Sequence, residues 1–251
     1  MPIVIKSPAD IERMRAAGLL VAQVHARMRE IVKPGVTTAE LDRVAAEMLA
    51  AAGAKASFLG VGGTYPASIC ASVDEELVHG IPGPRVLKEG QIISVDIGAY
   101  LNGFHGDAAV TYPVGKVSQE LQDLIAAAER CFWAGAKAAK AGARIGDVSA
   151  AVQREAEAGG YSVIREYGGH GIGRKMHEEP SVLNWGDPGT GTRLQNGMTF
   201  ALEPMIALGS PETRELADGW TVVMADGRPA AHYEHTLLIN DDEPIVLTAP
   251  A

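Results

Sequence analysis

A repeat of about half the chain length is the feature that most limits how this sequence can fold. Residues 90–96 (GQIISVD) and 197–203 (GMTFALE) both look like strands that end on a carboxylate, and they lie 107 residues apart. Residues 33–41 fall on residues 140–148 at the same offset. Two half-repeats related by a two-fold arrangement would bring their acidic strands together. The sequence therefore predicts a duplicated fold with paired carboxylates.

No boundary between separate domains is visible. The chain has 251 residues, 47% of them hydrophobic, which suffices for one large core or two fused lobes. No linker rich in Pro or Ser and no low-complexity run separates the halves. We expect a single domain over residues 1–251, with halves of roughly 1–115 and 116–251 that share a continuous sheet.

Charge and cysteine content exclude several kinds of function. The net charge of −9 disfavours a broad phosphate-binding surface, so no direct nucleic-acid function is expected. Cys70 and Cys131 are the only cysteines. Charged residues stand where a secretory signal would be apolar, and no run approaches the ~18 apolar residues that span a bilayer. We expect a soluble protein of a reducing cytoplasm, with no membrane segment.

Helix start signals occur twice in the first half. Ser7 before Pro8 suits a helix N-terminus, and apolar residues then recur at helical spacing as far as Pro34. Thr37 and Glu40 form a capping-box pattern that opens a second helix ending near residue 53. An amphipathic helix followed by a second, capped helix is therefore expected before the strands.

The second half repeats this plan. Ser118 can cap a helix that runs toward Gly142, and Asp147 opens a shorter helix that stops at Gly159. Two helices followed by strands, in each half, indicate an α+β fold.

A tight turn predicts where two carboxylates meet. Asn102-Gly103 is the dipeptide best suited to a type I′ hairpin turn, because both positions tolerate positive φ. A two-residue turn at this point places Gly98 opposite Asp107. Asp96 shares a face with Gly98, so it lies diagonal to Asp107, with β-carbons roughly 7 to 8 Å apart. Two carboxylates at this spacing can hold cations between them.

Ordinary solvated strand residues are the alternative interpretation of this acidic pair. The flanking sequence argues against it, because the strand around Asp96 is apolar on both faces. A buried carboxylate must find a cation or several hydrogen-bond donors. The apolar residues are Ile92, Ile93, Val95 and Ile97.

The second half contains a motif that corresponds to part of the acidic hairpin. His105-Gly-Asp107 corresponds to His232-Tyr-Glu234, each following its own carboxylate strand. These two motifs lie 127 residues apart, whereas the carboxylate strands lie 107 residues apart, so the second half has extra residues between Glu203 and Glu234. We expect residues 211–228 to form an excursion over the site.

A glycine-rich run around His170 lets the backbone approach another element closely. The run does not fit G-x-G-x-x-G, and no Walker or H-E-x-x-H pattern occurs. Hard oxygen ligands with a single imidazole suit manganese, iron, cobalt or zinc without choosing among them.

Short motifs rich in His, Gly and acidic residues follow one another along the chain: His79-Gly-Ile-Pro82, Asp96, Asn102-Gly-Phe-His-Gly-Asp107, Gly169-His170-Gly-Ile-Gly173, His177-Glu-Glu-Pro180, Phe200-Ala-Leu-Glu203-Pro-Met205 and Tyr233-Glu234-His-Thr236. Taken together, these motifs resemble the type I methionine aminopeptidase family, and the similarity covers nearly the whole chain. The resemblance implies the pita-bread fold, in which helices pack on a curved antiparallel sheet of two pseudo-symmetric halves. The short spacing between Glu203 and Glu234 is similar to that of bacterial-type members.

The resemblance implies a centre of two divalent metal ions, which could be Co, Mn, Fe, Zn or Ni. Asp107 and Glu234 would bridge the two ions, and a metal-bridging hydroxide would attack the first peptide carbonyl. Glu203 would also move the proton. The implied ligands are Asp96, Asp107, His170, Glu203 and Glu234.

Two further histidines acquire catalytic roles from the resemblance. His79 would contact the scissile amide nitrogen, and His177 would polarise the carbonyl or steady the tetrahedral intermediate. The motif context does not extend to His25 or His235, and His105 and His232 are expected to support the site rather than bind metal.

Family positions that line a methionine pocket are occupied by Tyr65, Cys70 and Trp220, with His79 at the edge and Met176 and His177 beside them. Many relatives carry an aromatic residue in place of Met176, so the wall here is softer and selectivity for methionine less strict. Leu59 and Gly62 also depart from residues often found at the pocket entrance. An alternative for Cys70 is that it only fills buried space.

The expected function is removal of the initiator methionine from nascent chains with a small second residue. The alternatives are an Xaa-Pro-directed aminopeptidase or dipeptidase of the same fold and a binding protein on an inactive version of it. Members of the first class usually carry an extra N-terminal domain, and the second would lack ligands. We expect nascent N-termini and, transiently, ribosomes as partners, and a monomeric state.

Overall fold

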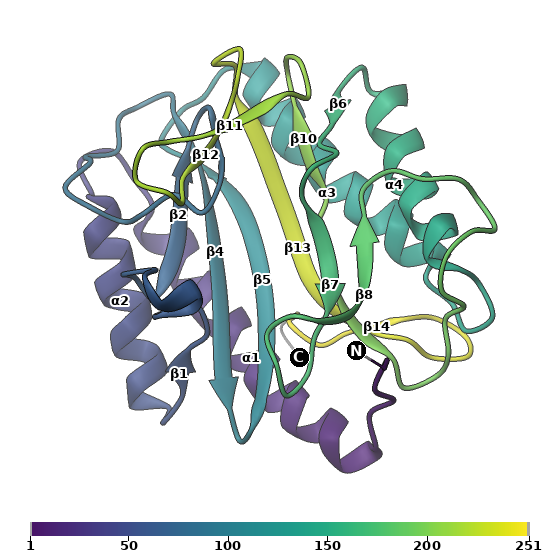
Figure 1. The fold of residues 1–251 in the computed structure, drawn as a ribbon. Coiled ribbons are helices and arrows are strands. Elements are labelled where there is room, and N and C mark those ends of the chain that lie inside the picture. The colour runs from purple at the N-terminus through teal and green to yellow at the C-terminus, as the bar shows by residue number, and fades with distance from the viewer. Residues whose placement is uncertain (1, 250–251) are drawn as a thin grey trace.

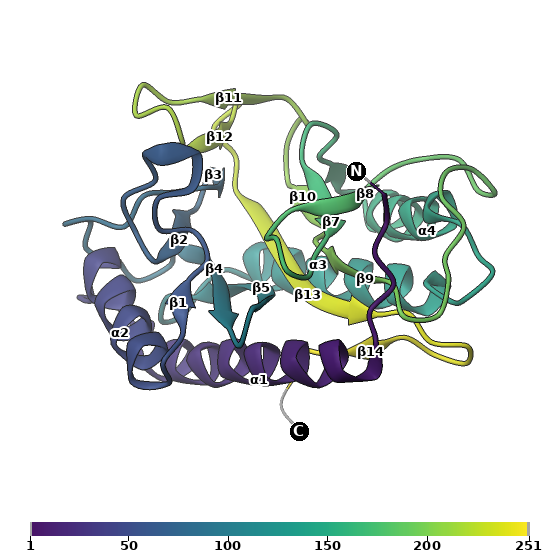
Figure 2. The same ribbon diagram turned by 60° about the horizontal axis from the view of Figure 1, so that its bottom comes forward.

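The computed structural model describes residues 2–249. Figures 1 and 2 show α1 and α3 on one face of a curved sheet, flanked by α2 and α4. All strand pairings are antiparallel. The helices are α1 (Pro8–Ile31), α2 (Thr38–Ala51), α3 (Gln119–Ala138) and α4 (Ile145–Ala158), with a short 3-10 turn η1 (Val61–Gly63). The strands are β1 (Lys55–Ala56), β2 (Ile69–Val73), β3 (Glu76–Val78), β4 (Ile92–Leu101), β5 (Phe104–Pro113), β6 (Ser162–Val163), β7 (Gly168–Gly171), β8 (Glu178–Leu183), β9 (Thr199–Leu202), β10 (Met205–Ala207), β11 (Thr213–Glu215), β12 (Val222–Met224), β13 (Ala230–Leu238) and β14 (Ile245–Val246).

Three of the helix starts occur as expected. Ser7 and Thr37 close capping boxes at α1 and α2, and the Ser118 hydroxyl accepts a hydrogen bond from the third amide of α3. The expectation for α4 was wrong. This helix begins at Ile145, and Asp147 is its third residue, where the carboxylate accepts a hydrogen bond from the Arg144 backbone N–H at 2.7 Å. A carboxylate at that position satisfies the cap amide from inside the first turn, so it marks the start without opening it.

Each helix pair covers the sheet of its own half. Val21, Val24 and Met28 of α1 are fully buried against strands of the first half. In α3, Leu124 and Phe132 are buried against strands of the second half. Removing a large buried side chain such as Phe132 typically costs about 3–5 kcal/mol. Two separate cores therefore hold the two halves of the sheet in a fixed shape.

The sheet runs continuously from one half into the other, as expected. Along it the strand order is β1-β4-β5-β13-β9-β7-β8, so the hairpin β4–β5 meets the pair β13–β9 at the centre. The β4–β5 register places Gly98 opposite Asp107, as the Asn102-Gly103 turn predicts. Glu234 of β13 lies opposite Ala109 of β5. The acidic residues of both halves consequently converge at the centre of one sheet.

Two threonine side chains fix the register at this junction. The Thr111 hydroxyl of β5 donates to the backbone oxygen of His232 at 2.9 Å and accepts from its N–H at 2.9 Å. From β13, the Thr236 hydroxyl donates to the Asp107 oxygen at 2.9 Å and accepts from the Asp107 N–H at 3.0 Å. A one-residue slip would turn every side chain to the opposite face, so these bonds help hold the acidic residues in place.

The two half-repeats are less alike than their sequences suggest. Asp96 lies in the middle of β4, which continues to Leu101, whereas β9 ends at Leu202, just before Glu203. Pro204 follows Glu203 and has no N–H to continue the ladder. Glu203 is therefore presented from a strand end and Asp96 from a strand interior.

The excursion expected at residues 211–228 is present. Strands β11 and β12 pair with each other, and β12 pairs with β3 of the first half, which makes a separate three-stranded sheet. Figure 1 shows these strands at the top of the molecule, over the space between the halves. Over residues 2–249, no helix combines the length and apolar character needed to cross a membrane.

Candidate metal centre

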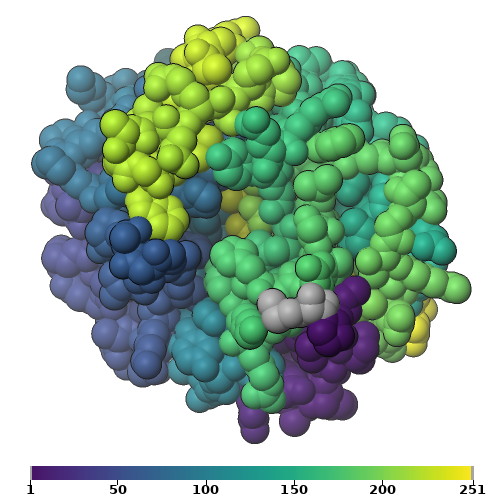
Figure 3. Space-filling view, in the orientation of Figure 1, coloured from purple at the N-terminus to yellow at the C-terminus, as the bar shows by residue number. Residues whose placement is uncertain are grey.

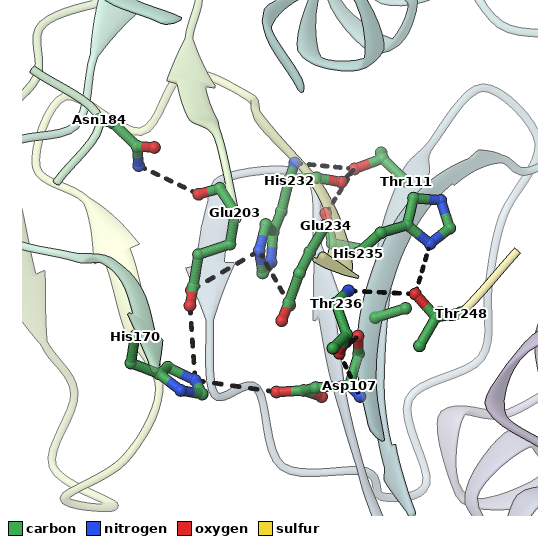
Figure 4. A network of polar contacts seen from close by, with 12 residues as sticks. Asp107, Thr111, His170, Asn184, Glu203, His232, Glu234, His235, Thr236 and Thr248 are labelled. Carbon is green, nitrogen blue, oxygen red and sulfur yellow. Dashed lines mark hydrogen bonds and ion pairs between the residues drawn. The ribbon is translucent and has the colours of Figure 1, made fainter. Parts of the chain in front are cut away.

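Asp107, Glu203 and Glu234 gather with His170 and His232 in one place (Figure 4), and Asp96 lies close to Asp107 and Glu234. Ligand atoms of Asp96, Asp107 and Glu234 lie within 4.8 Å of one another, and so do those of Glu203, His232 and Glu234. Glu234 belongs to both groups. His170 Nε2 lies 3.6 Å from Glu203 Oε1 and 3.9 Å from Asp107 Oδ2. The five ligands inferred from sequence therefore stand together, with Asp107 and Glu234 at the centre.

Burial makes this cluster electrostatically costly. Loss of solvent and the repulsion of neighbouring carboxylates raise the pKa values of Asp96, Asp107, Glu203 and Glu234 well above their usual range. Asp96, Asp107 and Glu234 each have one carboxylate oxygen that is buried without a hydrogen-bond partner among the described residues. No Lys or Arg among residues 2–249 lines the cavity. In the metal-free fold protons can neutralise these carboxylates, and a bound cation would supply the positive charge once they ionise.

The donor set fits a divalent metal ion. Carboxylate oxygens with an imidazole nitrogen suit several such metals. Burial and then the nearby His177 lower the pKa of His170 to about 4, so its imidazole is neutral at physiological pH and can donate a lone pair. The His170 Nδ1 lies 3.0 Å from the Gly171 backbone oxygen, which orients Nε2 toward the carboxylates.

Both expected catalytic histidines border the same cavity. The His177 ring lies 4.3 Å from the His170 ring, measured between centroids. His79 follows β3 with a positive φ of 60°, a strained backbone conformation that turns its ring toward Tyr167, 6.1 Å away. Burial lowers the pKa of both histidines, with His177 adding to the effect on His79. Neutral imidazoles are thus available beside the carboxylates.

The cavity has a volume of about 350 Å³ and an apolar wall. Tyr65, Cys70, Met176 and Trp220 all line it. The rings of Tyr65 and Trp220 meet edge to face at 5.1 Å. Burial raises the pKa of the Cys70 thiol, so this side chain stays neutral and adds apolar surface. Figure 3 shows the molecule hollowed between blue, green and yellow-green segments.

Met176, one of the positions where the sequence departs from its resemblance, lines this wall, and another such position, Gly62, lies beside the Trp220 ring. A Cβ added there would stand 3.0 Å from the Trp220 ring, at a φ of 60° that disfavours other residues. Leu59 is 59% exposed and is not among the residues that line the cavity. The pocket entrance is therefore shaped by Gly62 and Trp220 rather than by Leu59.

The structure places His232, which was expected to support the site, next to the carboxylates, and it adds Tyr167, which the sequence did not indicate. His232 is 2% exposed, and its Nε2 lies 3.6 Å from Glu234 Oε2 and 3.9 Å from Glu203 Oε2, within the cluster itself. Its position two residues before Glu234 on one strand face was the available signal. Tyr167 also lines the cavity, next to the glycine-rich run. His105, by contrast, contacts Ser57 Oγ at 2.9 Å through Nδ1 and stays outside the cluster.

Comparisons with known proteins agree with this geometry. The model of metallopeptidase family M24 matches residues 12–241. Methionine aminopeptidase 1 of Bacillus subtilis (strain 168) is 47% identical over 246 residues, which cover 98% of this chain and 99% of the relative. The methionine aminopeptidase structure from Thermotoga maritima is 42% identical, with a TM-score of 0.97 over 99% of this chain and 100% of that chain. The prolidase from Pyrococcus furiosus has a TM-score of 0.80, but at 19% identity over 99% of this chain and 66% of that chain it shows the fold alone.

Proposed function

The chain belongs to metallopeptidase family M24, and from this premise we propose that it removes the initiator methionine from nascent polypeptides with a small second residue. Removal of an N-terminal methionine by a metallopeptidase is the activity of relatives that match it over nearly its whole length. The pita-bread fold expected from the sequence is confirmed. The observation that carries the proposal is the buried carboxylate cluster at the floor of an apolar cavity.

The proposed metal centre holds two divalent ions, whose identity among Co, Mn, Fe, Zn and Ni is open. The two ligand groups that share Glu234 support this number. The ligands would be Asp96, Asp107, His170, Glu203 and Glu234. Bound metal supplies a water that is acidic at neutral pH and polarises the scissile carbonyl.

The protein side chains supply proton transfer and positioning. Glu203 would accept a proton in this proposal, because its carboxylate lies beside the other proposed ligands and borders the cavity. His79 would contact the scissile amide nitrogen, and His177 the carbonyl side of the peptide. Both border the cavity in neutral form, so each can donate a hydrogen bond from one ring nitrogen.

Selectivity for methionine would come from the apolar wall. The Tyr65, Cys70 and Trp220 side chains offer surface that accepts a flexible thioether, and Met176 adds a soft wall beside His177. A bulky second residue would clash near the metals. We further propose that the protein acts as a monomer in the cytoplasm on nascent chains, with transient association to ribosomes.

Metal-dependent release of free methionine tests the proposal. After chelation the peptide Met-Ala-Ser is assayed beside peptides containing Ala-Pro, with manganese, iron or cobalt added back. Restored methionine release is expected, together with about two metal ions per chain by elemental analysis. Cleavage only before proline would assign the Xaa-Pro-directed activity, and no cleavage with both ions bound would favour a binding protein.

A further inference from the structure

A buried lysine outside the carboxylate cluster has no role in the proposed chemistry. The Lys6 side chain is 2% exposed, and its Nζ lies 2.7 Å from Glu178 Oε2. The same Nζ donates to the Val4 backbone oxygen at 3.2 Å. Burying an ammonium group costs several kcal/mol unless it is paired with good geometry. Here the partner comes from 172 residues away in the chain, so the pair joins two distant segments.

Glu178 organises the turn that precedes it. Its Oε1 accepts a hydrogen bond from the Lys175 backbone N–H at 3.1 Å, while Oε2 receives the Lys6 ammonium. Although burial acts to raise the pKa of Glu178, the hydrogen bonds from Lys6 and Lys175 hold it below its usual value. Both oxygens of this carboxylate are therefore engaged in fixing residues 173–178.

Gly173 completes this arrangement. A Cβ at this position would stand 2.6 Å from Lys6 Cε and 2.9 Å from Lys6 Nζ, so a side chain there would displace the lysine. The Gly173 backbone oxygen accepts a hydrogen bond from the His105 N–H at 2.8 Å. One end of the turn is thus tied to β5 and the other to the Lys6 ammonium.

The N-terminal segment that carries Lys6 is itself anchored. The Lys6 backbone N–H donates a hydrogen bond to the Gly197 backbone oxygen at 2.8 Å, and the chain then enters α1 at Pro8. Asp10 in the first turn of α1 forms an exposed ion pair with Arg174 at 3.0 Å. Figure 2 shows the segment passing from the second half of the molecule to the start of α1. The segment therefore holds the turn from a rigid base.

Met176 and His177, the two residues just before Glu178, border the cavity. We propose that the Lys6–Glu178 ion pair is a brace, supplied by the N-terminal segment, that positions His177 against the substrate. This inference rests on the proposed role of His177. Without the ammonium group, the Glu178 carboxylate would move toward solvent to recover hydration, and the adjoining His177 would move with it.

Substitutions of the pair separate positioning from general stability. In K6M the buried carboxylate loses its cation, and we expect kcat for Met-Ala-Ser to fall by about tenfold or more, since small displacements of catalytic groups carry penalties of this order. The KM and the metal content should stay close to those of the native protein. K6M/E178Q removes both charges and keeps an acceptor for the Lys175 N–H, so it should recover a large part of kcat. R174A removes the exposed pair with Asp10 and the contact of the guanidinium with the Phe104 ring, and it leaves Lys6–Glu178 intact. It is the matched control, expected to keep native kcat.

Three outcomes would overturn the brace: unchanged kcat in K6M despite a lower melting temperature, a parallel loss of bound metal, or a double variant no better than K6M. Absence of methionine release from the native protein would instead contradict the proposed function. In that case crystal structures of the native protein and K6M still test the brace. An unmoved His177 ring would refute it, and a displaced ring would support it.

Discussion

His232 is the residue whose surroundings say most about how the carboxylates are held. Its Nε2 is buried, faces Glu203 and Glu234 at 3.9 and 3.6 Å, and has no hydrogen-bond partner among the described residues. Burial lowers the pKa of His232 to about 3, with smaller contributions from His79 and His25, so the ring is neutral and carries one N–H. In the tautomer with the proton on Nε2, this N–H faces two of the proposed metal ligands and would orient them.

Replacing His232 with alanine should therefore weaken metal binding by about 10- to 100-fold, the usual effect of removing a group that orients a metal ligand. Gln at this position retains an N–H donor, and H232Q should lose much less. Calorimetric titration of the chelated variants with manganese measures both affinities. Equal, native-like affinities in the two variants would show that His232 does not act on the ligands.

Glu234, as a proposed ligand, should stabilise the metal centre and destabilise the metal-free fold. Burial and three neighbouring carboxylates, Asp107 first, raise its pKa. The E234Q substitution removes one ionisable carboxyl group and replaces it with an amide of nearly the same shape. The repulsion within the cluster is then weaker, so the chelated variant should melt a few degrees higher than the chelated native protein. Turnover should fall more than about a hundredfold, since a ligand is lost.

Thermal melts with chelator and an assay with added metal measure these two effects. A chelated E234Q variant that melts lower than the native protein would contradict the repulsion argument.

At the residue scale, the sequence predicts what strand alternation and turn chemistry determine. The register of Asp107 against Gly98 followed from Asn102-Gly103 alone. Strand alternation also places His232 on the face of Glu234, but the position of Tyr167 and the distance of His232 from Glu203 could not be obtained in this way. Their positions depend on how β7 and β13 meet strands that are distant in sequence, and local periodicity does not contain that information.

Among the elements, the strands β11 and β12 have the most direct effect on the cavity. The loop between them carries Trp220, whose Nε1 donates to Thr64 Oγ1 at 3.2 Å and whose ring contacts Tyr65. The excursion was predictable from the extra residues of the second half. Its pairing with β3, which makes it a small sheet rather than a loop, was not, because that pairing joins segments more than a hundred residues apart.

Removing the Trp220 ring should enlarge the methionine pocket and raise KM for Met-Ala-Ser by about tenfold, within the ~1–3 kcal/mol range of lost pocket contacts. Metal content should not change, since the Trp220 ring packs against Tyr65 and His79 and its Nε1 donates to Thr64 Oγ1. Steady-state kinetics of W220A give the result. W133A is the matched control, because Trp133 is 49% exposed on α3 and lies outside the cavity. An unchanged KM in W220A would remove this residue from the pocket.

Helix boundaries show the same limit of sequence reasoning at the element scale. The caps at Ser7, Thr37 and Ser118 were recognisable because each needs only a hydroxyl and a nearby amide. The start of α4 was misplaced by two residues. Arg144 adopts the extended cap conformation and its side chain donates to the Gly191 backbone oxygen, a contact between distant segments.

For the whole molecule, the raised pKa values of the carboxylates couple metal binding to pH and to stability. In the metal-free fold, burial first and mutual repulsion second keep protons on this cluster that an unfolded chain would release near its ordinary pKa. The contribution of the cluster to stability is therefore fully present below the unfolded pKa, and it is lost as the pH rises through the folded values. Metal ions replace those protons and reverse the loss.

The gain in melting temperature on adding metal should consequently be larger at about pH 8 than at about pH 6, and binding should release protons. His170 should contribute nothing to that release, because its pKa of about 4 leaves it neutral throughout this range. Calorimetric titrations in two buffers of different ionisation enthalpy count the protons, and E234Q should release fewer than the native protein.

A metal-induced gain in melting temperature that is equal at both pH values, with no proton release, would mean that the carboxylates are already ionised in the metal-free fold. The burial argument for a cation at this site would then fail.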